Sequence, residues 1–170
     1  MQGGLGLAAM GLAAVLAACG PAGKADGEAP FAAWQATNLA DGSPWRLDPG
    51  EGAVVINVWA TWCEPCRREM ASLERAHRGL AATGIRVVGL NVDEDVLLAR
   101  EFVRRQGLTF PNVSDPAQSL AKERLGVKHL PTTLAVGRDG RVRWREEAAR
   151  DWSGPGELAR IERTLGPGSP

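Results

Sequence analysis

The chain alternates between short apolar runs and segments whose apolar residues recur with helical spacing. Residues 53–60 (AVVINVWA) and 85–92 (IRVVGLNV) are nearly continuous and rich in β-branched side chains, which is typical of strands buried on both faces. Between them, residues 66–82 place apolar side chains from Met70 to Leu80 at three- and four-residue steps, which predicts an amphipathic helix. This arrangement favours a β-α-β unit with parallel strands.

The same patterns predict the remaining elements. A β-hairpin is expected over residues 31–47, around the turn signal Asp41-Gly42, and Asp139-Gly140 marks a second hairpin turn. The order β-α-β-α-α-β-β-α after the first hairpin indicates an α/β fold with parallel central strands and an antiparallel end. The further helices are predicted over 96–105, 116–125 and 156–165, and the further strands over 132–136 and 142–144.

The first thirty residues differ from the rest. Residues 1–18 hold no charged side chain, and their apolar stretch has the length of a signal-peptide core but is short for a membrane span. The run Leu16-Ala17-Ala18-Cys19 resembles a bacterial lipobox, which implies cleavage before Cys19 and a diacylglycerol on its sulfur. A signal peptide normally begins with Lys or Arg, and this segment has neither. A cleaved soluble form and an uncleaved membrane anchor are therefore the alternatives.

These features predict three parts: a signal peptide over 1–18, a lipidated Cys19 with a flexible linker over 19–30, and one folded domain over 31–170. Residues 20–30 of the linker are mainly Gly, Pro, Ala and charged residues, and they show no periodic spacing of apolar side chains. The protein is therefore expected on the periplasmic side of a membrane, held there by lipid.

Composition narrows the class of function. The 170 residues include 20 Lys and Arg against 20 Asp and Glu, so the formal net charge is zero and nothing calls for a nucleic-acid partner. Three cysteines are too few for a disulfide scaffold, and a domain of this size does not need one. The cysteines are therefore expected to serve chemistry.

The motif Trp62-Cys63-Glu64-Pro65-Cys66 falls where the first buried strand meets the first helix. At a helix N-terminus, unbonded N–H groups and the helix dipole favour an anion, and hence the Cys63 thiolate. The two-residue gap lets Cys66 attack a mixed disulfide formed on Cys63. A zinc half-site and a static disulfide are the other interpretations, although zinc would need two more ligands at workable positions, and His77 and His129 are the only histidines.

The sequence resembles the thioredoxin superfamily, and more narrowly the TlpA/ResA-like membrane-anchored thioredoxins, over residues 31–165. The matching segments are 55–66 (VINVWATWCEPC), 88–93 (VGLNVD) and 130–133 (LPTT). The resemblance implies a thioredoxin-like fold, with a central mixed β-sheet flanked by helices and an N-terminal β-hairpin extension. It also implies a cis Leu130-Pro131 bond, and substrate binding by Trp62, Leu130, Pro131 and Thr132.

The resemblance also directs attention to the proton that Cys66 must lose. Relatives hold a buried acid on the strand below, where this chain has Asn57, which cannot accept a proton. ResA-like proteins carry a functional Glu at the position of Glu69, whose pKa would rise on burial. The alternative is a solvated charge beside Arg67 and Arg68. Ala71 stands where relatives often have a helix-kinking Pro.

The function implied is a thiol–disulfide oxidoreductase that reduces exported proteins, as in cytochrome c or copper-protein maturation. It would need no cofactor beyond the Cys63/Cys66 pair, and no metal. Its partners would be substrate proteins and a membrane-embedded thiol reductant. A Cu(I) chaperone of the same fold and a thiol peroxidase are alternatives, although the peroxidase pattern Pro-x-x-x-Thr-x-x-Cys does not precede Cys63. His77 and His129 are expected at the surface, Trp59 and Trp62 near the disulfide, and the other tryptophans in or around the core.

Overall fold

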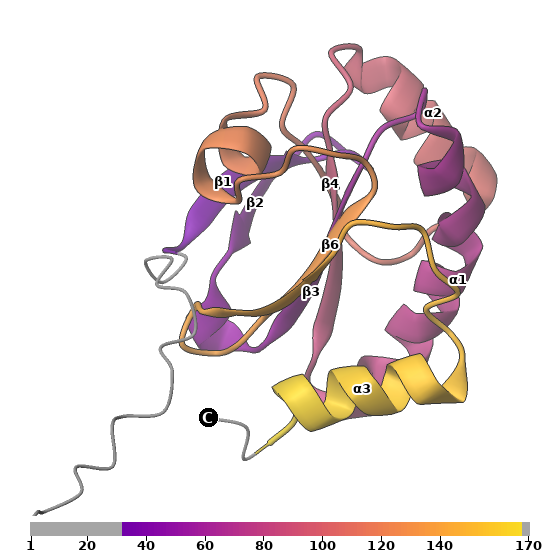
Figure 1. Cartoon of the computed structure of the whole chain (residues 1–170). Helices are drawn as coiled ribbons and strands as arrows, with labels where there is room; N and C mark the ends of the chain where they lie inside the picture. The colour runs from indigo at the N-terminus through magenta and orange to yellow at the C-terminus, as the bar shows by residue number, and fades with distance from the viewer. Residues whose placement is uncertain (1–31, 168–170) are drawn as a thin grey trace, which may run out of the picture.

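The computed structural model describes residues 32–167 as a single mixed β-sheet flanked by helices (Figure 1). The predicted signal peptide, the linker up to Pro30 and Cys19 therefore lie outside the described residues. The strands are β1 Trp34–Asn38, β2 Pro44–Leu47, β3 Val54–Trp59, β4 Arg86–Asn91, β5 Asn112–Ser114, β6 Thr132–Val136 and β7 Val142–Glu146. The helices are α1 Glu64–Leu80, α2 Val96–Gln106 and α3 Pro155–Leu165, with short turns η1 Pro49–Glu51, η2 Ala81–Thr83 and η3 Ser119–Arg124.

The sheet order is β2-β1-β5-β4-β3-β6-β7. Strands β3, β4 and β5 run parallel, whereas β6 and β7 are antiparallel to their neighbours, which confirms the predicted mixed sheet. Every residue of β3 is buried, as its β-branched sequence predicts. The N-terminal hairpin β1–β2 is confirmed as well, and it extends the sheet by pairing antiparallel with β5.

Two predictions needed correction. Strand β5 was not predicted, because three residues are too few to show a period; Gly89 on β4 leaves room for it, since a Cβ there would lie 2.0 Å from Asn112 Oδ1. The helix expected over 116–125 is a π-helical turn over Ser119–Arg124 instead. The buried carboxylate of Asp115 accepts hydrogen bonds from the Ala121 amide and the Ser119 hydroxyl, which fixes this turn.

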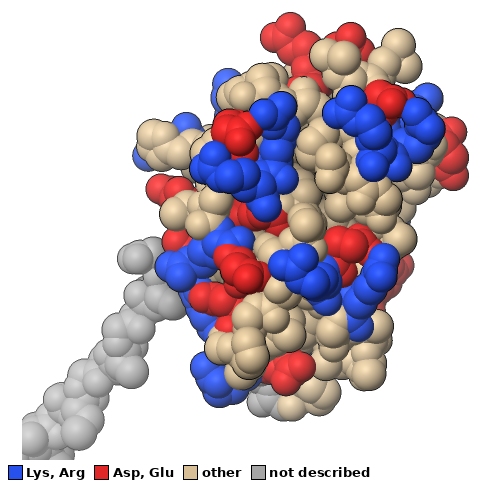
Figure 2. Space-filling model, turned by 90° about the vertical axis from the view of Figure 1, so that its right-hand side faces the viewer, with Lys and Arg blue, Asp and Glu red and all other residues tan. Residues whose placement is uncertain are grey.

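Helices α1, α2 and α3 cover one face of the sheet, and η3 packs on the opposite face (Figure 1). Basic and acidic side chains are interspersed over the helical side (Figure 2). Several form pairs one turn apart, as Arg78 does with Glu74 on α1 and Arg104 with Glu101 on α2. Within residues 32–167, no helix is long and apolar enough to cross a membrane.

Candidate active site

Cys63 and Cys66 form a disulfide at the start of α1, with their Cα atoms 5.3 Å apart. Cys63 is the N-cap of the helix, and its Sγ accepts a hydrogen bond from the Cys66 amide at 3.3 Å. Pro65 occupies the first turn, where its missing N–H leaves no partner unbonded. This geometry matches the expectation that helix N–H groups support negative charge on Cys63 sulfur.

The turn that delivers Cys63 is held by a buried acid. Asp93, just beyond β4, accepts hydrogen bonds of 2.9 Å from both the amide and the hydroxyl of Thr61. Asn91 donates to the same carboxylate at 2.6 Å. Because β3 and β4 are parallel, their carboxyl ends meet here, and the acid of one strand braces the turn that follows the other.

The Leu130-Pro131 peptide bond is cis, as the resemblance implied. The antiparallel register pairs Thr132 at the start of β6 with Val58 near the end of β3, so this loop lies beside the disulfide turn. Leu130 is half-buried and lines a pocket together with Cys63, whereas Pro131 is buried. Thr132 is buried as well, and its hydroxyl donates to the His129 carbonyl at 2.7 Å. Its side chain therefore braces the loop.

Glu69 is buried on the helix-covered face of the sheet, with 2% of its surface exposed. Its Oε1 accepts a hydrogen bond from Asn57 Nδ2 at 2.8 Å. Its Oε2 accepts two, from Trp152 Nε1 at 2.8 Å and from the Arg150 amide at 3.1 Å. The alternative of a solvated charge beside Arg67 and Arg68 is therefore wrong, since those two arginines instead pair with the exposed Glu64.

Burial raises the pKa of Glu69, as expected of a carboxyl group at this position if it is buried. The Trp152 indole, the Asn57 amide and the Arg150 backbone N–H oppose this rise, because all three donate to the ionised form. Three donors thus hold the carboxyl group in one orientation, while burial opposes its ionisation.

Trp152 is the site residue that sequence reasoning missed. It was assigned to the core or its rim, and it is fully buried, but its indole N–H also contacts the carboxylate. Its ring stacks on Trp144 at 6.0 Å between centroids, with the planes 6° apart. No local pattern predicts this contact, since 83 positions separate it from Glu69. A tryptophan that directly follows two charged residues, Arg150 and Asp151, was the only available signal.

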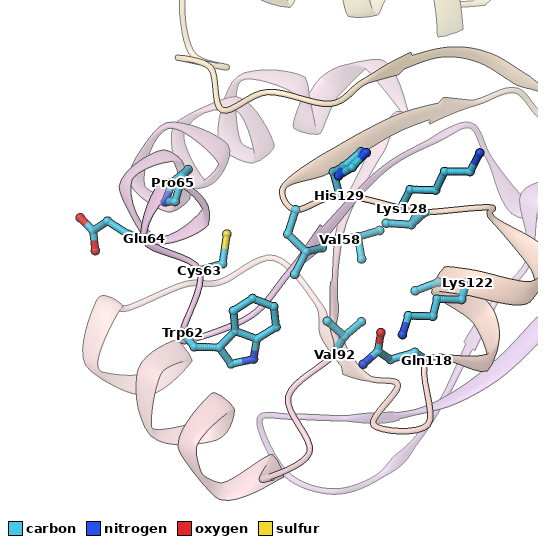
Figure 3. A pocket seen from close by; sticks show the side chains of 13 residues that line it. Val58, Trp62, Cys63, Glu64, Pro65, Val92, Gln118, Lys122, Lys128 and His129 are labelled. Carbon is cyan, nitrogen blue, oxygen red and sulfur yellow. The ribbon is translucent and has the colours of Figure 1, made fainter.

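The opposite face of the sheet carries a pocket of about 620 Å³ that opens at Cys63. Trp62 borders it and is 69% exposed, so it lies beside the disulfide on its solvent side. Successive side chains of β3 point to opposite faces of the sheet, so Asn57 points toward Glu69 whereas Val58 lines the pocket. Figure 3 shows Cys63 at the edge of the pocket, with Pro65 above it and Trp62 below it.

The other predicted residues separate into core and surface. Trp59 is fully buried, packs against Phe102 at 5.2 Å and donates to Asn112 Oδ1, while Trp34 and Trp45 are half-buried against the core. His129 is exposed, whereas His77 is half-buried against Phe110. Among residues 32–167, no group of three His, Cys, Asp or Glu side chains is placed to hold a metal ion.

Fold and site together define a protein of the thioredoxin-like class, with a Cys-x-x-Cys disulfide between a strand and a helix and a cis-proline loop beside it. The chain belongs to the AhpC/TSA family, whose profile matches residues 28–145.

Named relatives agree with this assignment. The thiol-disulfide oxidoreductase ResA of Geobacillus thermodenitrificans is 36% identical over 104 residues, which are 61% of this chain and 59% of that protein. The chain thus spans somewhat more than half the length of this relative. A DsbF homologue from Corynebacterium diphtheriae has a similar structure, with a TM-score of 0.66, 26% identity, and coverage of 81% of this chain and 87% of that one. A secreted Mycobacterium tuberculosis disulfide oxidoreductase homologous to DsbE aligns with a TM-score of 0.63 at 25% identity, covering 75% and 95%.

Proposed function

We propose that this protein is a thiol–disulfide oxidoreductase that reduces disulfides of exported proteins. The observation that carries the proposal is the combination of a Cys63–Cys66 disulfide at a helix N-terminus with a buried, hydrogen-bonded Glu69 one turn further along. A disulfide kept only for stability would need neither a pocket at Cys63 nor a carboxyl group of raised pKa behind it.

The reaction begins with the reduced pair. The Cys63 thiolate attacks one sulfur of a substrate disulfide, a bond forms between the two sulfurs, and the other substrate sulfur leaves as a thiolate that takes up a proton. The helix N-terminus favours the attacking thiolate. The substrate backbone lies against Leu130, in the manner of an added strand, with Trp62 covering its other side.

Cys66 then resolves the mixed disulfide. It is fully buried, so its thiol needs a base within the protein, and Glu69 takes the proton. The Cys66 thiolate attacks Cys63 sulfur, the Cys63–Cys66 bond forms, and the second substrate sulfur leaves as a thiolate that takes up a proton. Two electrons have then passed from the pair to the substrate, and a dithiol donor must return them. We assign that role to a membrane-embedded thiol reductant.

An exported location and a lipid anchor at Cys19 belong to the same proposal. The lipobox-like run Leu16-Ala17-Ala18-Cys19 supports the anchor, and the linker that follows would hold the domain near the membrane. The similar structure from M. tuberculosis is that of a secreted protein. Metabolic labelling with a fatty-acid analogue tests the anchor: wild-type chain takes up the label, and Cys19→Ala does not. Equal labelling of both would refute it.

The test of the activity is trapping of the mixed disulfide. Cys66→Ser leaves Cys63 able to attack but removes the resolving sulfur, so a covalent adduct with a disulfide peptide should accumulate. Cys63→Ser should form none, because the remaining sulfur is buried. Wild-type protein should release reduced peptide and form its own disulfide. If neither variant forms an adduct and wild-type protein reduces nothing, the proposed activity is wrong.

The peroxidase alternative makes a different prediction in the same assay. Hydrogen peroxide would oxidise Cys63 to a sulfenic acid in the absence of any disulfide, and would itself be reduced to water. The absence of the Pro-x-x-x-Thr-x-x-Cys pattern weighs against it, and the pocket of about 620 Å³ is larger than a peroxide needs.

A further inference from the structure

The pocket on the η3 side of the sheet has an apolar floor and a polar wall (Figure 3). Val58 and Val92 form the floor next to Cys63. The wall comes from η3 and the residue before it, through Lys122 and Gln118. In Figure 3 the Lys122 side chain reaches back over the pocket toward Val92 and Gln118.

The charge on Lys122 is not compensated. Within residues 32–167 its ammonium group takes part in no ion pair and no side-chain hydrogen bond, although its backbone N–H donates to Gln118. Other surface cations are paired, as Arg67, Arg78 and Arg104 are. Lys128 also lines the pocket, but in Figure 3 its ammonium group points away from Lys122 and Gln118. A cation left unpaired at the mouth of a pocket is suited to an anionic ligand.

Gln118 adds a second donor to the same wall. It is the one non-glycine residue of the described chain with a positive φ, at 56°, and the turn fixed by Asp115 holds it there. Non-glycine residues in this left-handed conformation are uncommon and gather at functional sites. Its amide group and the Lys122 ammonium together offer donors on one side of the pocket, which fits the two oxygens of a carboxylate.

The hollow on the other side of Trp62 has the opposite character. Glu94, Asp95 and the 58%-exposed Leu98 line it, and Gln118 and Val92 border both hollows. A polypeptide crossing Cys63 therefore meets a basic wall on one side of Trp62 and acidic side chains on the other. A carboxylate on the polypeptide is attracted to the Lys122 side and repelled from the Glu94 side.

We infer that Lys122 and Gln118 select polypeptide substrates that carry an acidic side chain next to the reacting cysteine. The inference rests on the proposed activity and names the substrate class for it. The occupant is a polypeptide because the pocket extends from Leu130 to the exposed Trp62. A single small thiol compound would not span this surface. The acidic residue binds in the pocket while the cysteine meets Cys63.

The test compares reduction rates of three synthetic disulfide peptides by the full, reduced chain at low salt. The peptides are identical except that Asp, Asn or Lys flanks one cysteine. We expect the wild-type protein to reduce the Asp peptide about fivefold faster than the Asn peptide and slowest the Lys peptide. Added salt should shrink the differences. Lys122→Gln should abolish the preference and Lys122→Glu should reverse it. Arg124→Gln, which removes a charge from the same turn outside the pocket lining, should leave it intact.

The possible outcomes distinguish the proposed preference for acidic substrates from the proposed reductase activity. Equal rates for the Asp and Asn peptides, or an unchanged preference in Lys122→Gln, would overturn the selection of acidic substrates while leaving the activity standing. No reduction of any peptide, nor of an uncharged small disulfide, would overturn both. A dependence on Lys122 seen with glutathione disulfide but not with the peptides would show that the pocket serves a small acidic thiol, and would overturn the polypeptide assignment.

Discussion

The indole Nε1 of Trp152 donates a hydrogen bond of 2.8 Å to Oε2 of Glu69, a contact between residues 83 positions apart. It ties the segment before α3 to the helix that carries the disulfide. Because Trp152 is fully buried, its indole N–H has no water to bond with, and the carboxylate satisfies it. The same contact favours the ionised form of a group that burial disfavours. Burial and hydrogen bonding therefore shift the pKa of Glu69 in opposite directions.

Glu69→Gln should slow resolution of the mixed disulfide. The carboxylate must be ionised to take the Cys66 proton, so the resolution rate of the wild-type protein should rise with pH through the raised pKa of Glu69. Glutamine keeps the shape and loses the base, so this limb of the pH profile should vanish and the rate should fall by about a hundredfold. Stopped-flow tryptophan fluorescence measures the step. An unchanged pH profile would remove Glu69 from the mechanism.

The same variant should be at least as stable as the wild-type protein at neutral pH. A carboxyl group whose pKa is raised on folding binds protons more tightly in the folded state, so it reduces stability as pH rises from 4.5 through the folded pKa. Glutamine removes that loss. Asn57 Oδ1 is buried and lacks a hydrogen-bond partner in the described chain, so the amide can turn to accept from Gln at position 69. Urea unfolding across this pH range checks the prediction; a large loss of stability in Glu69→Gln at neutral pH would contradict it.

Trp152→Phe should move the pH limb of the resolution rate upward. The variant removes one of three donors to the carboxylate, so the pKa of Glu69 rises further. Trp144→Phe is the matched control, because its ring stacks on Trp152 while its own buried N–H donates no hydrogen bond in the described chain. Both should lose about 1–3 kcal/mol of stability. Equal shifts of the pH profile in the two variants would mean that altered packing, and not the lost hydrogen bond, changes the pKa of Glu69.

Asn57→Asp should couple two carboxyl groups. The new acid would face Glu69 Oε1 across the 2.8 Å that Asn57 now spans, and two carboxylates so close share one proton. The pair should then hold its proton to higher pH than Glu69 alone, and slow resolution near neutral pH. Thr133→Val removes the other side-chain partner of Asn57 without adding charge, so it should leave the midpoint close to that of the wild-type protein. A midpoint for Asn57→Asp at or below that of the wild-type protein would contradict the prediction.

Much of this fold is visible in the sequence because its central pieces have strong local patterns. The β-branched run of β3, the helical spacing of α1 and the motif around Cys63 each predict their own structure. The position of Glu69 one turn after Cys66 follows from helix geometry. Resemblance supplied the cis-proline loop at Leu130-Pro131, which the structure confirms.

What the sequence did not reveal depends on tertiary contacts. Strand β5 forms because β4 and the N-terminal hairpin offer it edges to pair with, and its three residues carry no period of their own. Trp152 reaches Glu69 only after β6, β7 and the following loop have brought it across the molecule. The donors of Gln118 and Lys122 meet in one pocket because a π-helical turn, anchored by Asp115, replaces the regular helix that the spacing predicted.

The reduction potential of the Cys63/Cys66 pair tests the central claim most directly. The full chain would be equilibrated with dithiol redox buffers of graded potential, and the fraction reduced would be measured by thiol alkylation. The account predicts full, reversible cycling at a potential near or below about −250 mV, in the range of thioredoxin, as a reductase requires. A potential near about −120 mV would make the protein an oxidant, and a pair that does not cycle at all would contradict disulfide exchange itself.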